Sequence, residues 1–406
     1  MNIRRISLLL IGICGYVQVI LYNGIIKHLG LCVSSIEGVR PFLPEFFLIV
    51  YLVGWIISEK QYKKNIVMFI FWLIAVCVMS IISAPSITAI LSAIRDLLEP
   101  CLFLITLSTM KLTNKEKKKL VDLLENSLII FVLIGAYFAI SQKINDPQAT
   151  AMYFTGHSVW GVDVEDGIRM STGAFGFKVL GTTASAETFG FYNMFAIIVV
   201  LFSRKRRIVK IAITVFSFVN MYCSGMKTAI LVAILVMYIY LTYRYGKKAR
   251  LIVKIGFVLI MVGLFYYMVF VLSDWEESSV YARLVLWKSL LSKENLINLF
   301  IPTKAFFYSA KAGNKGIISF WDNSYLYFAY STGIVGLAML VNLLNSKVKA
   351  LYKICGDMIN AGSMVLLSIL LSGLSTCLFL GRNYLAIAII YVCIMASVTE
   401  DEQVES

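Results

Sequence analysis

Four polar side chains at the borders of strongly apolar stretches have the chemistry needed to handle an anionic substrate. Three are cations: Lys227 in CSGMKTA, Arg283 in SVYARLVLWKSLL and Arg169 in GVDVEDGIRMSTGAFG. The fourth is the carboxylate of Asp322 in FWDNSY. Arginine can bind phosphate through two N–H groups, lysine acts as a point charge, and a carboxylate can orient or deprotonate a hydroxyl. These residue types favour an anion-binding site with an acid–base group beside it.

The elements that position these side chains must lie in a membrane. Hydrophobic residues make up 59% of the 406 residues and charged residues only 15%, too little polar cover for a soluble protein of this length. In a membrane protein, the net charge of +14 indicates first which loops face the cytoplasm, and it is not taken as evidence of nucleic-acid binding. The cysteines form no CxxC pair and the two histidines, His28 and His157, are far apart. We therefore expect no metal centre, no cofactor and no disulfide framework.

Twelve apolar segments approach the roughly 20 residues that cross the hydrocarbon of a bilayer. They are residues 6–26, 42–58, 66–84, 87–110, 127–142, 179–202, 208–223, 229–243, 251–272, 324–343, 364–380 and 383–398. The sequence shows no repeat, linker or soluble domain. We predict an all-α polytopic membrane protein with a single domain, residues 1–406, and both termini on one side.

Alternate connections between these spans are rich in Lys and Arg, among them 111–119, 204–207, 243–250 and 347–353. The positive-inside bias assigns them to the cytoplasm. The opposite connections are very short or long and mixed in charge, and the longest is 274–323, between the ninth and tenth spans. In this outer loop Val280, Leu284, Trp287 and Leu291 recur at helical spacing, which predicts an amphipathic helix on the membrane surface. Function is expected on this outer face.

Each outer cation also has a simpler explanation. Lys227 can snorkel at the interface, but the Ser-Gly before it favours a helix break that leaves amide groups beside the ammonium, which would form an anion site. Arg283 can contact lipid headgroups. Arg169 can pair with the acidic residues just before it.

Asp322 and Asn323 end the outer loop where the next span begins, so either can be an N-cap of that helix as well as part of a site. Arg95, Asp96 and Glu99 lie together inside a predicted span, and Arg95 can neutralise Glu99 four residues on; such a cluster should face the bundle interior. Glu187 stands alone in the span 179–202, where it lines a polar cavity or pairs with an outer cation.

Several of these segments follow one another in a known order. SGMKTAILVAIL, then YARLVLWKSLL in a long outer loop, then DNSYLYFAYSTGIVGLAML, with RMSTGAFG before the sixth span, resemble the O-antigen ligase and polysaccharide polymerase superfamily. Its members are bacterial membrane enzymes that act on undecaprenyl-linked sugars. The resemblance covers roughly residues 85–345 and implies a GT-C-like fold.

The resemblance assigns roles residue by residue. Lys227 falls where the family usually has Arg, so the charge is kept but the two-pronged donor is lost. Arg283 matches the loop Arg, with Trp287 four residues on, and Arg169 matches an Arg before a Gly-Thr/Ser-Phe turn. Asp322 stands where ligases have the His of a His-Asn pair whose Asn matches Asn323. The Gly-rich turn after the loop helix is replaced here by NLFIPTKAFF.

These matches imply a metal-independent polymerase of undecaprenyl-diphosphate-linked repeat units for capsule or O-antigen, in the bacterial cytoplasmic (inner) membrane, with both termini cytoplasmic and the active site on the periplasmic or extracellular side. Catalytic roles fall to Arg283, Lys227 and Asp322. Substrate-binding roles fall to Arg169, Asn323, Trp287, Glu187 and Arg95. Donor and acceptor are both lipid-linked, membrane lipids surround the protein, a chain-length regulator is a candidate partner, and no nucleic acid is expected. The alternatives are an O-antigen ligase, which the missing His disfavours, and a lipid-linked oligosaccharide transporter, which should place its cations at the bundle midplane.

Overall fold

The computed structural model describes residues 64–82, 112–144, 186–244, 296–303, 323–374 and 382–397, with shorter stretches between 84 and 105, 158 and 183, and 255 and 288, and at 378. Within these residues, five helices are long and apolar enough to cross a membrane. The chain is therefore a helical membrane protein, as its composition predicts. The count of twelve spans stays a prediction, because spans such as 6–26 and 42–58 lie outside the described residues.

The chain divides into two compact units, each assembled from separated stretches of sequence. Unit 1 contains Met1–Tyr51, Thr113–Leu259 and Ile359–Ser368, and unit 2 contains Leu52–Leu112, Ile260–Met358 and Ile369–Ser406. Neither unit is a consecutive segment of the chain. The prediction of one domain over residues 1–406 stays a prediction.

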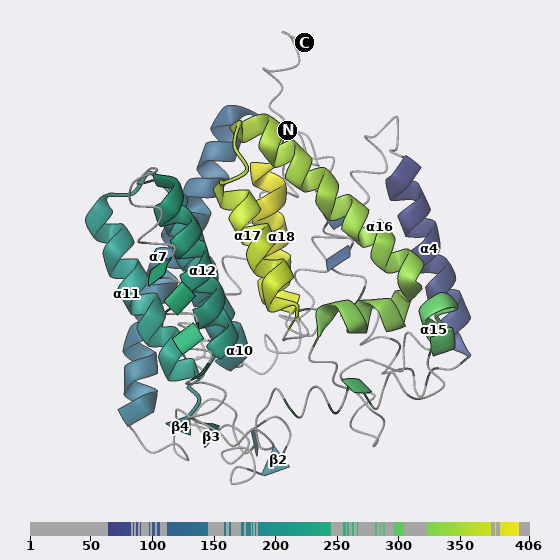
Figure 1. The fold of residues 1–406 in the computed structure, drawn as a ribbon, viewed down its shortest axis with the longest axis horizontal. Coiled ribbons are helices and arrows are strands. Elements are labelled where there is room, and N and C mark those ends of the chain that lie inside the picture. The colour runs from purple at the N-terminus through teal and green to yellow at the C-terminus, as the bar shows by residue number, and fades with distance from the viewer. Residues whose placement is uncertain are drawn as a thin grey trace, which may run out of the picture. The chain divides into compact units, whose positions relative to one another are not determined.

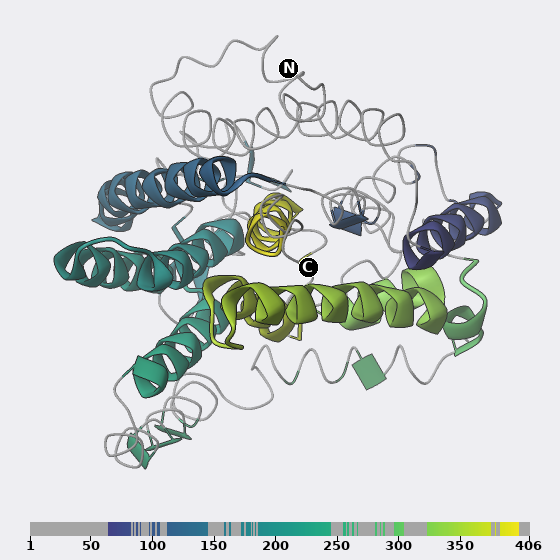
Figure 2. The same cartoon turned by 90° about the horizontal axis from the view of Figure 1, so that it is seen from above.

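Unit 1 is built around helix α10 (Ala186–Phe202). It packs side by side with α7 (Asn114–Ile144), α11 (Arg207–Ser224) and α12 (Lys227–Arg244) (Figures 1 and 2). Every side chain from Phe189 to Leu201 is buried. A helix that is apolar on all sides belongs in the middle of a membrane bundle, so α10 forms the core of this unit.

Two asparagines connect the helices inside unit 1. The Asn220 side-chain amide donates to the carbonyl oxygen of Val132 on α7 at 3.1 Å and to Asn193 Oδ1 on α10 at 2.8 Å. Asn193 in turn donates to the carbonyl oxygen of Phe189 at 2.8 Å. In a membrane bundle, apolar packing alone does not set how far one helix is shifted along another, and side-chain amides that form hydrogen bonds between helices can do so. These bonds therefore fix α11 against α7 and α10.

The helices of unit 1 alternate in direction. Gln142, near the end of α7, contacts Gly181, which precedes α10, and the end of α11 is tied to Val179. At the opposite end Lys205, before α11, donates to Asn126 of α7. One end of the unit therefore gathers the end of α7, the start of α10 and the α11–α12 turn.

Two small hairpins precede α10. Strand β1 (Ser158–Val159) pairs antiparallel with β2 (Val162–Asp163), and β3 (Thr172–Gly173) pairs antiparallel with β4 (Gly176–Phe177). Gly173 is opposite Gly176, so the RMSTGAFG motif folds back on itself and leads directly to Lys178. The all-α prediction holds for the described residues apart from these two-residue strands.

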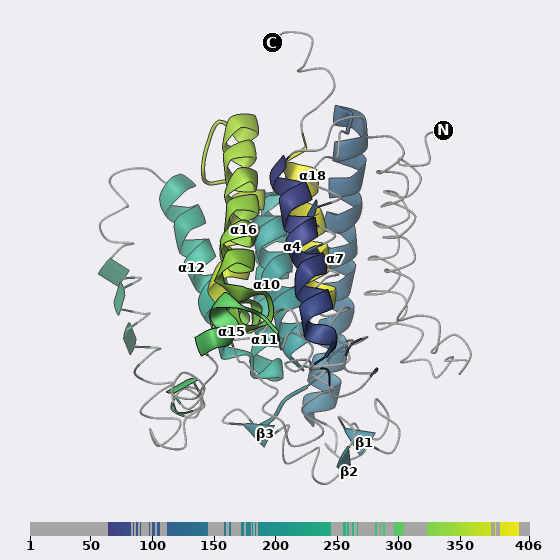
Figure 3. The ribbon, with the colours of Figure 1, turned by 90° about the vertical axis from the view of Figure 1, so that its right-hand side faces the viewer.

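Unit 2 contains α4 (Lys64–Ile81), the short α15 (Leu296–Phe300), α16 (Ser324–Cys355), the last residues of α17 (Ala361–Ser372) and α18 (Arg382–Met395). Helix α16 bends at Gly333, whose backbone is not helical (φ 75°, ψ 167°), and α4 and α15 lie beside it (Figures 1 and 3). Trp72 Nε1 on α4 donates to the Thr332 carbonyl oxygen at 2.8 Å. The bend is therefore held from outside the helix.

Segment 97–105 also belongs to unit 2. Leu97, Cys101, Leu104 and Ile105 are all buried. This spacing of four, three and one residues is that of one face of a helix, in agreement with the predicted span 87–110. Arg95, Asp96 and Glu99 lie outside the described residues.

Two lysine-rich segments predicted as cytoplasmic connections are continuous with helices, and their position in the cytoplasm stays a prediction. Residues 114–119 form the first turns of α7, and residues 347–353 continue α16. Lysine is a good helix former, and a helix can extend past the hydrocarbon without losing its backbone hydrogen bonds. At the start of α7 a capping box secures the extension: the Thr113 amide donates to Glu116 Oε2 at 2.9 Å and the Glu116 amide donates to Thr113 Oγ1 at 3.3 Å.

Candidate functional site

The turn between α11 and α12 is the break that the Ser-Gly sequence predicts. Helix α11 ends at Ser224, Gly225 adopts the left-handed conformation (φ 69°), and α12 begins at Lys227. The amide of Gly225 donates to the Tyr222 carbonyl oxygen at 3.0 Å and that of Met226 to the Met221 carbonyl oxygen at 3.2 Å. The Lys227 amide donates to the Gly225 carbonyl oxygen at 3.1 Å. The expectation of free amide groups beside Lys227 is therefore wrong for residues 225–227, because the C-cap of α11 uses the first two and the Gly225 carbonyl accepts from the third.

A second lysine packs onto the same turn. A Cβ atom on Gly225 would lie 3.1 Å from Lys178 Cγ and 3.7 Å from its Cδ and Cε, so the aliphatic part of Lys178 covers the glycine. The amide of Val179 donates to the Cys223 carbonyl oxygen at 3.1 Å. Only glycine adopts this backbone conformation without strain and also leaves room for the lysine. The backbone bond and the side-chain contact together hold Lys178 at the turn.

A third lysine comes from the end of α7. Lys143 lies in the last turn of that helix, close enough to the Cys223 thiol for a Coulomb interaction. Its neighbour Gln142 is buried and clamps Gly181: Gln142 Nε2 donates to the Gly181 carbonyl oxygen at 2.8 Å, and the Gly181 amide donates to Gln142 Oε1 at 2.9 Å. This pair of bonds fixes the end of α7 against the segment that enters α10.

Lys143, Lys178 and Lys227 thus gather at one end of unit 1, and we call them the lysine cluster. All three are partly buried. Each comes from a different element: α7, the segment after β4, and α12. Several lysines brought to one end by separate elements create a local positive charge that attracts an anion.

Glu187 lies at the same end of unit 1 as the lysine cluster. It is exposed in the first turn of α10, which begins at Ala186. The predicted start of this helix at residue 179 is wrong, because Val179 and Gly181 are held in non-helical contacts with Cys223 and Gln142. Glu187 does lie in the helix, as predicted, but in its first turn. The N-terminus of a helix stabilises an acidic side chain. Substrate binding by Glu187 stays a prediction.

Asn323 is the N-cap of α16. Its Oδ1 accepts from the amides of Tyr325 at 2.9 Å and Leu326 at 3.0 Å, and its Nδ2 donates to the Leu374 carbonyl oxygen at 3.1 Å. The capping interpretation is therefore confirmed for Asn323. The residue is 7% exposed and its side-chain amide holds the start of the helix, so its predicted contact with substrate stays a prediction.

Trp287 belongs to the stretch predicted as an amphipathic helix. The described residues there, Tyr281, Val285, Trp287 and Lys288, have helical backbone, and Trp287 is less exposed than the other three. Its Nε1 is buried and makes no hydrogen bond. The helix prediction is supported at these positions, and the substrate-binding role of Trp287 stays a prediction.

The remaining predicted site residues, Arg283, Asp322, Arg169 and Arg95, lie outside the described residues. Of the others, Lys227 and Glu187 belong to unit 1, and Asn323 and Trp287 to unit 2. Sequence reasoning missed Lys143 and Lys178 as site residues. The signal was present, since both are basic residues at the borders of a predicted outer loop, the same criterion that selected Lys227.

The opposite end of unit 1 is also basic but is organised differently. Arg204, Lys205, Arg206, Arg207, Lys210 and Arg244 form what we call the arginine-rich end. Lys205 Nζ donates to Asn126 Oδ1 at 2.6 Å, and Lys210 Nζ donates to the Leu201 carbonyl oxygen at 2.7 Å. Both lysines lie within Coulomb range of the buried carboxylate Glu125. Here cations are engaged with the protein itself.

Among the described residues no three His, Cys, Asp or Glu side chains come together as metal ligands would. The described cysteines, Cys77, Cys101, Cys223, Cys355 and Cys393, are free thiols. Among the described residues, the candidate site therefore consists of the lysine cluster and the backbone of the α11–α12 turn. No protein-family model and no curated protein matches the chain.

Proposed function

We propose that the chain is a membrane glycosyltransferase that polymerises undecaprenyl-diphosphate-linked oligosaccharide repeat units for a capsule or O-antigen. The lysine cluster is the observation that carries this proposal, because three ammonium groups from three elements suit the charge of a diphosphate better than a single interfacial lysine would. The cluster lies at the end of unit 1 opposite the arginine-rich end, as the positive-inside bias requires of an outer site.

The chemistry needs charge stabilisation more than covalent catalysis. An acceptor hydroxyl attacks the anomeric carbon, the bond from that carbon to the diphosphate oxygen breaks, and the hydroxyl proton passes to a base. The lysine cluster holds the charge that develops on the leaving diphosphate, and the family resemblance of the sequence gives Arg283 the same role. Asp322 takes the proton or orients the hydroxyl. Attack opposite the leaving group inverts the anomeric centre, and no step requires a metal.

The finer features of the proposal rest on the sequence. They are twelve spans in a GT-C-like arrangement, an outer loop 274–323 that contributes Arg283, and substrate contacts from Arg169, Arg95, Asn323, Trp287 and Glu187. The protein works in the bacterial inner membrane, with both termini in the cytoplasm. Polymerisation is favoured over ligation because Asp322 stands where ligases of this resemblance have His.

The test is chain lengthening by the purified protein in detergent–lipid micelles, where both faces are accessible. With an undecaprenyl-diphosphate-linked repeat unit as the only glycan, the wild type should produce a ladder of longer glycans on a gel. Lys227→Ala should lower the rate about 100-fold, the effect of removing one preorganised donor, and Lys227→Arg should retain most of it.

The matched control is Arg206→Ala, which removes an exposed cation from the arginine-rich end of the same unit. Its rate should equal that of the wild type. The assignment of the site is wrong if the Lys227 and Arg206 variants behave alike. The proposed function is wrong if the wild type consumes no lipid-linked repeat unit.

A further inference from the structure

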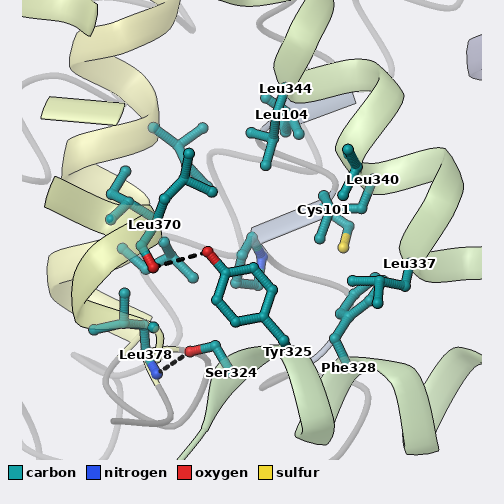
Figure 4. A pocket seen from close by; sticks show the side chains of 16 residues that line it. Cys101, Leu104, Ser324, Tyr325, Phe328, Leu337, Leu340, Leu344, Leu370 and Leu378 are labelled. Atoms are coloured by element: carbon teal, nitrogen blue, oxygen red, sulfur yellow. Dashed lines mark hydrogen bonds between the residues drawn. The ribbon is translucent and has the colours of Figure 1, made fainter. Parts of the chain in front are cut away.

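Unit 2 contains an apolar pocket between α16, the end of α17, α18 and residues 100–104. Figure 4 shows its lining, in which leucines and other apolar side chains from these four segments face one another. Leu337, Leu340 and Leu344 form the wall contributed by the second part of α16, and Leu385 and Ile389 form the wall contributed by α18.

The polar atoms at the pocket are already satisfied. The Tyr325 hydroxyl donates to the Leu370 carbonyl oxygen at 2.8 Å, and Ser324 Oγ accepts from the Leu378 amide at 2.8 Å, as the dashed lines of Figure 4 mark. The remaining heteroatom of note is the weakly polar thiol of Cys101. A polar ligand would lose its hydration here without gaining hydrogen bonds, so the pocket selects hydrocarbon.

The pocket is open toward the apolar surface of its own helix. Val341 lines the pocket and is also 51% exposed. On the same helix Ile334 and Val335 are 50% and 40% exposed. Because α16 is long and apolar enough to span a membrane, this exposed surface is in contact with lipid chains, and a hydrocarbon chain can enter the pocket sideways from the bilayer.

One end of the pocket coincides with the start of α16. Ser324 and Tyr325 line that end. They directly follow the cap Asn323 and, one residue earlier, Asp322. From there the lining continues along α16 past the bend at Gly333 to Leu344. A lipid chain lying in the pocket with its headgroup at this end would therefore reach the start of α16, which Asn323 caps and Asp322 precedes in the sequence.

We propose that this pocket binds the polyprenyl chain of a lipid-linked sugar substrate. The inference rests on the proposed function and adds to it a specificity site for the lipid carrier. A polyprenyl chain bears a methyl branch on every isoprene unit and fills a broad apolar pocket better than the straight acyl chains of bulk phospholipid, since close packing rewards each added contact. The pocket thereby distinguishes the carrier lipid from the surrounding bilayer.

The first experiment maps binding without requiring glycosyl transfer. Full-length protein in phosphatidylglycerol-containing nanodiscs is photolysed with a sugar-free polyprenyl diphosphate that carries a diazirine within the chain, and the labelled peptides are identified by mass spectrometry. Label should fall on peptides containing Leu337–Leu344 and Leu385–Ile389 and should be competed by undecaprenyl phosphate. Label elsewhere, or equal competition by added phosphatidylglycerol, overturns the inference.

The second experiment fills the pocket. Leu340→Trp should reduce labelling by about 10-fold, because the larger side chain occupies the space of the lipid chain and weakens its binding. The matched control is Ile334→Trp, which adds the same side chain at an exposed position of the same helix outside the pocket. The control should label as the wild type does; equal loss in both variants overturns the inference. If Leu340→Trp does not fold, the wild-type map alone decides.

Chain lengthening separates this inference from the proposed function. If the polyprenyl probe labels the pocket but the protein lengthens no glycan, the pocket stands and the polymerase proposal fails. The opposite outcome is that the wild type lengthens glycans and that Leu340→Trp leaves unchanged the ratio of the KM values for a long-chain and a ten-carbon lipid donor. In that case the pocket is not the carrier site and the polymerase proposal stands.

Discussion

The two ends of unit 1 are both basic, yet their cations are positioned by different features of the fold. At the arginine-rich end the charges are numerous and are engaged with Asn126, the Leu201 carbonyl oxygen and the region of Glu125. At the other end the described residues bring together three lysines from separate elements, and Lys178 packs onto the Gly225 turn. The number of charges therefore indicates which side of the membrane an end occupies, whereas the fixed geometry indicates where an anion can bind.

The comparison predicts that the two ends lie on opposite sides of the membrane. In a variant whose own cysteines are replaced by serine or alanine, Glu187→Cys should react with a membrane-impermeant thiol reagent in intact spheroplasts. Arg206→Cys should react only after the membrane is permeabilised. Both positions are exposed, so accessibility alone does not distinguish them. Labelling of both from the same side would contradict the alternation of helices in unit 1.

The next largest effect concerns the tight geometry of the lysine end. Gly181→Ala places a Cβ 2.3 Å from the Phe189 ring at a residue with φ 55°. Backbone strain and overpacking together should lower the free energy of unfolding by about 2–5 kcal/mol, measured by denaturant titration in micelles.

Gly356→Ala is the matched control for this strain. Gly356 has φ 68°, but a Cβ there meets nothing within 4 Å. Only the backbone term applies, so the loss should be about 1–2 kcal/mol. Equal losses in the two glycine variants would mean that contact with Phe189 does not tighten the lysine end.

The smallest effect is expected at the arginine-rich end. Arg244 stacks on the Tyr240 ring, 5.8 Å from its centroid, and is exposed. Arg244→Ala should cost about 0.5–1 kcal/mol, the value of an exposed cation–π contact, and should leave chain lengthening unchanged. Arg244→Lys should lose less. A drop in glycan lengthening comparable with that of Lys227→Ala would remove the functional distinction between the two ends.

Much of unit 1 could be predicted from the sequence, because apolar runs interrupted by turn residues are a local signal. The predicted spans 208–223 and 229–243 lie within α11 and α12, and the Ser-Gly break is in place. The helices extend further than the predicted spans into 111–119 and 347–353, because lysine is a good helix former. At residue 113 the sequence did contain a helix-start signal, the Thr-x-x-Glu of the capping box.

The lysine cluster as a whole could not be predicted in this way. Lys227 is visible because its own turn is short. Lys178 is brought to that turn by the backbone hydrogen bond between Val179 and Cys223. Lys143 is brought there because α7 ends beside Gly181, in the segment between β4 and α10. These are contacts between residues distant in sequence, and periodicity within one segment contains no information about them.

The hydrogen bond from Trp72 to the Thr332 carbonyl oxygen has a consequence for biosynthesis. Its two residues are 260 positions apart in the chain. The bend at Gly333 interrupts the ladder of α16 inside an apolar environment, where an unpaired carbonyl is costly. Helix α4, which leaves the ribosome long before α16, carries the donor that removes this cost. We therefore expect α4 to be in place in the membrane before α16 adopts its bent form, so that the order of synthesis matches the order of assembly.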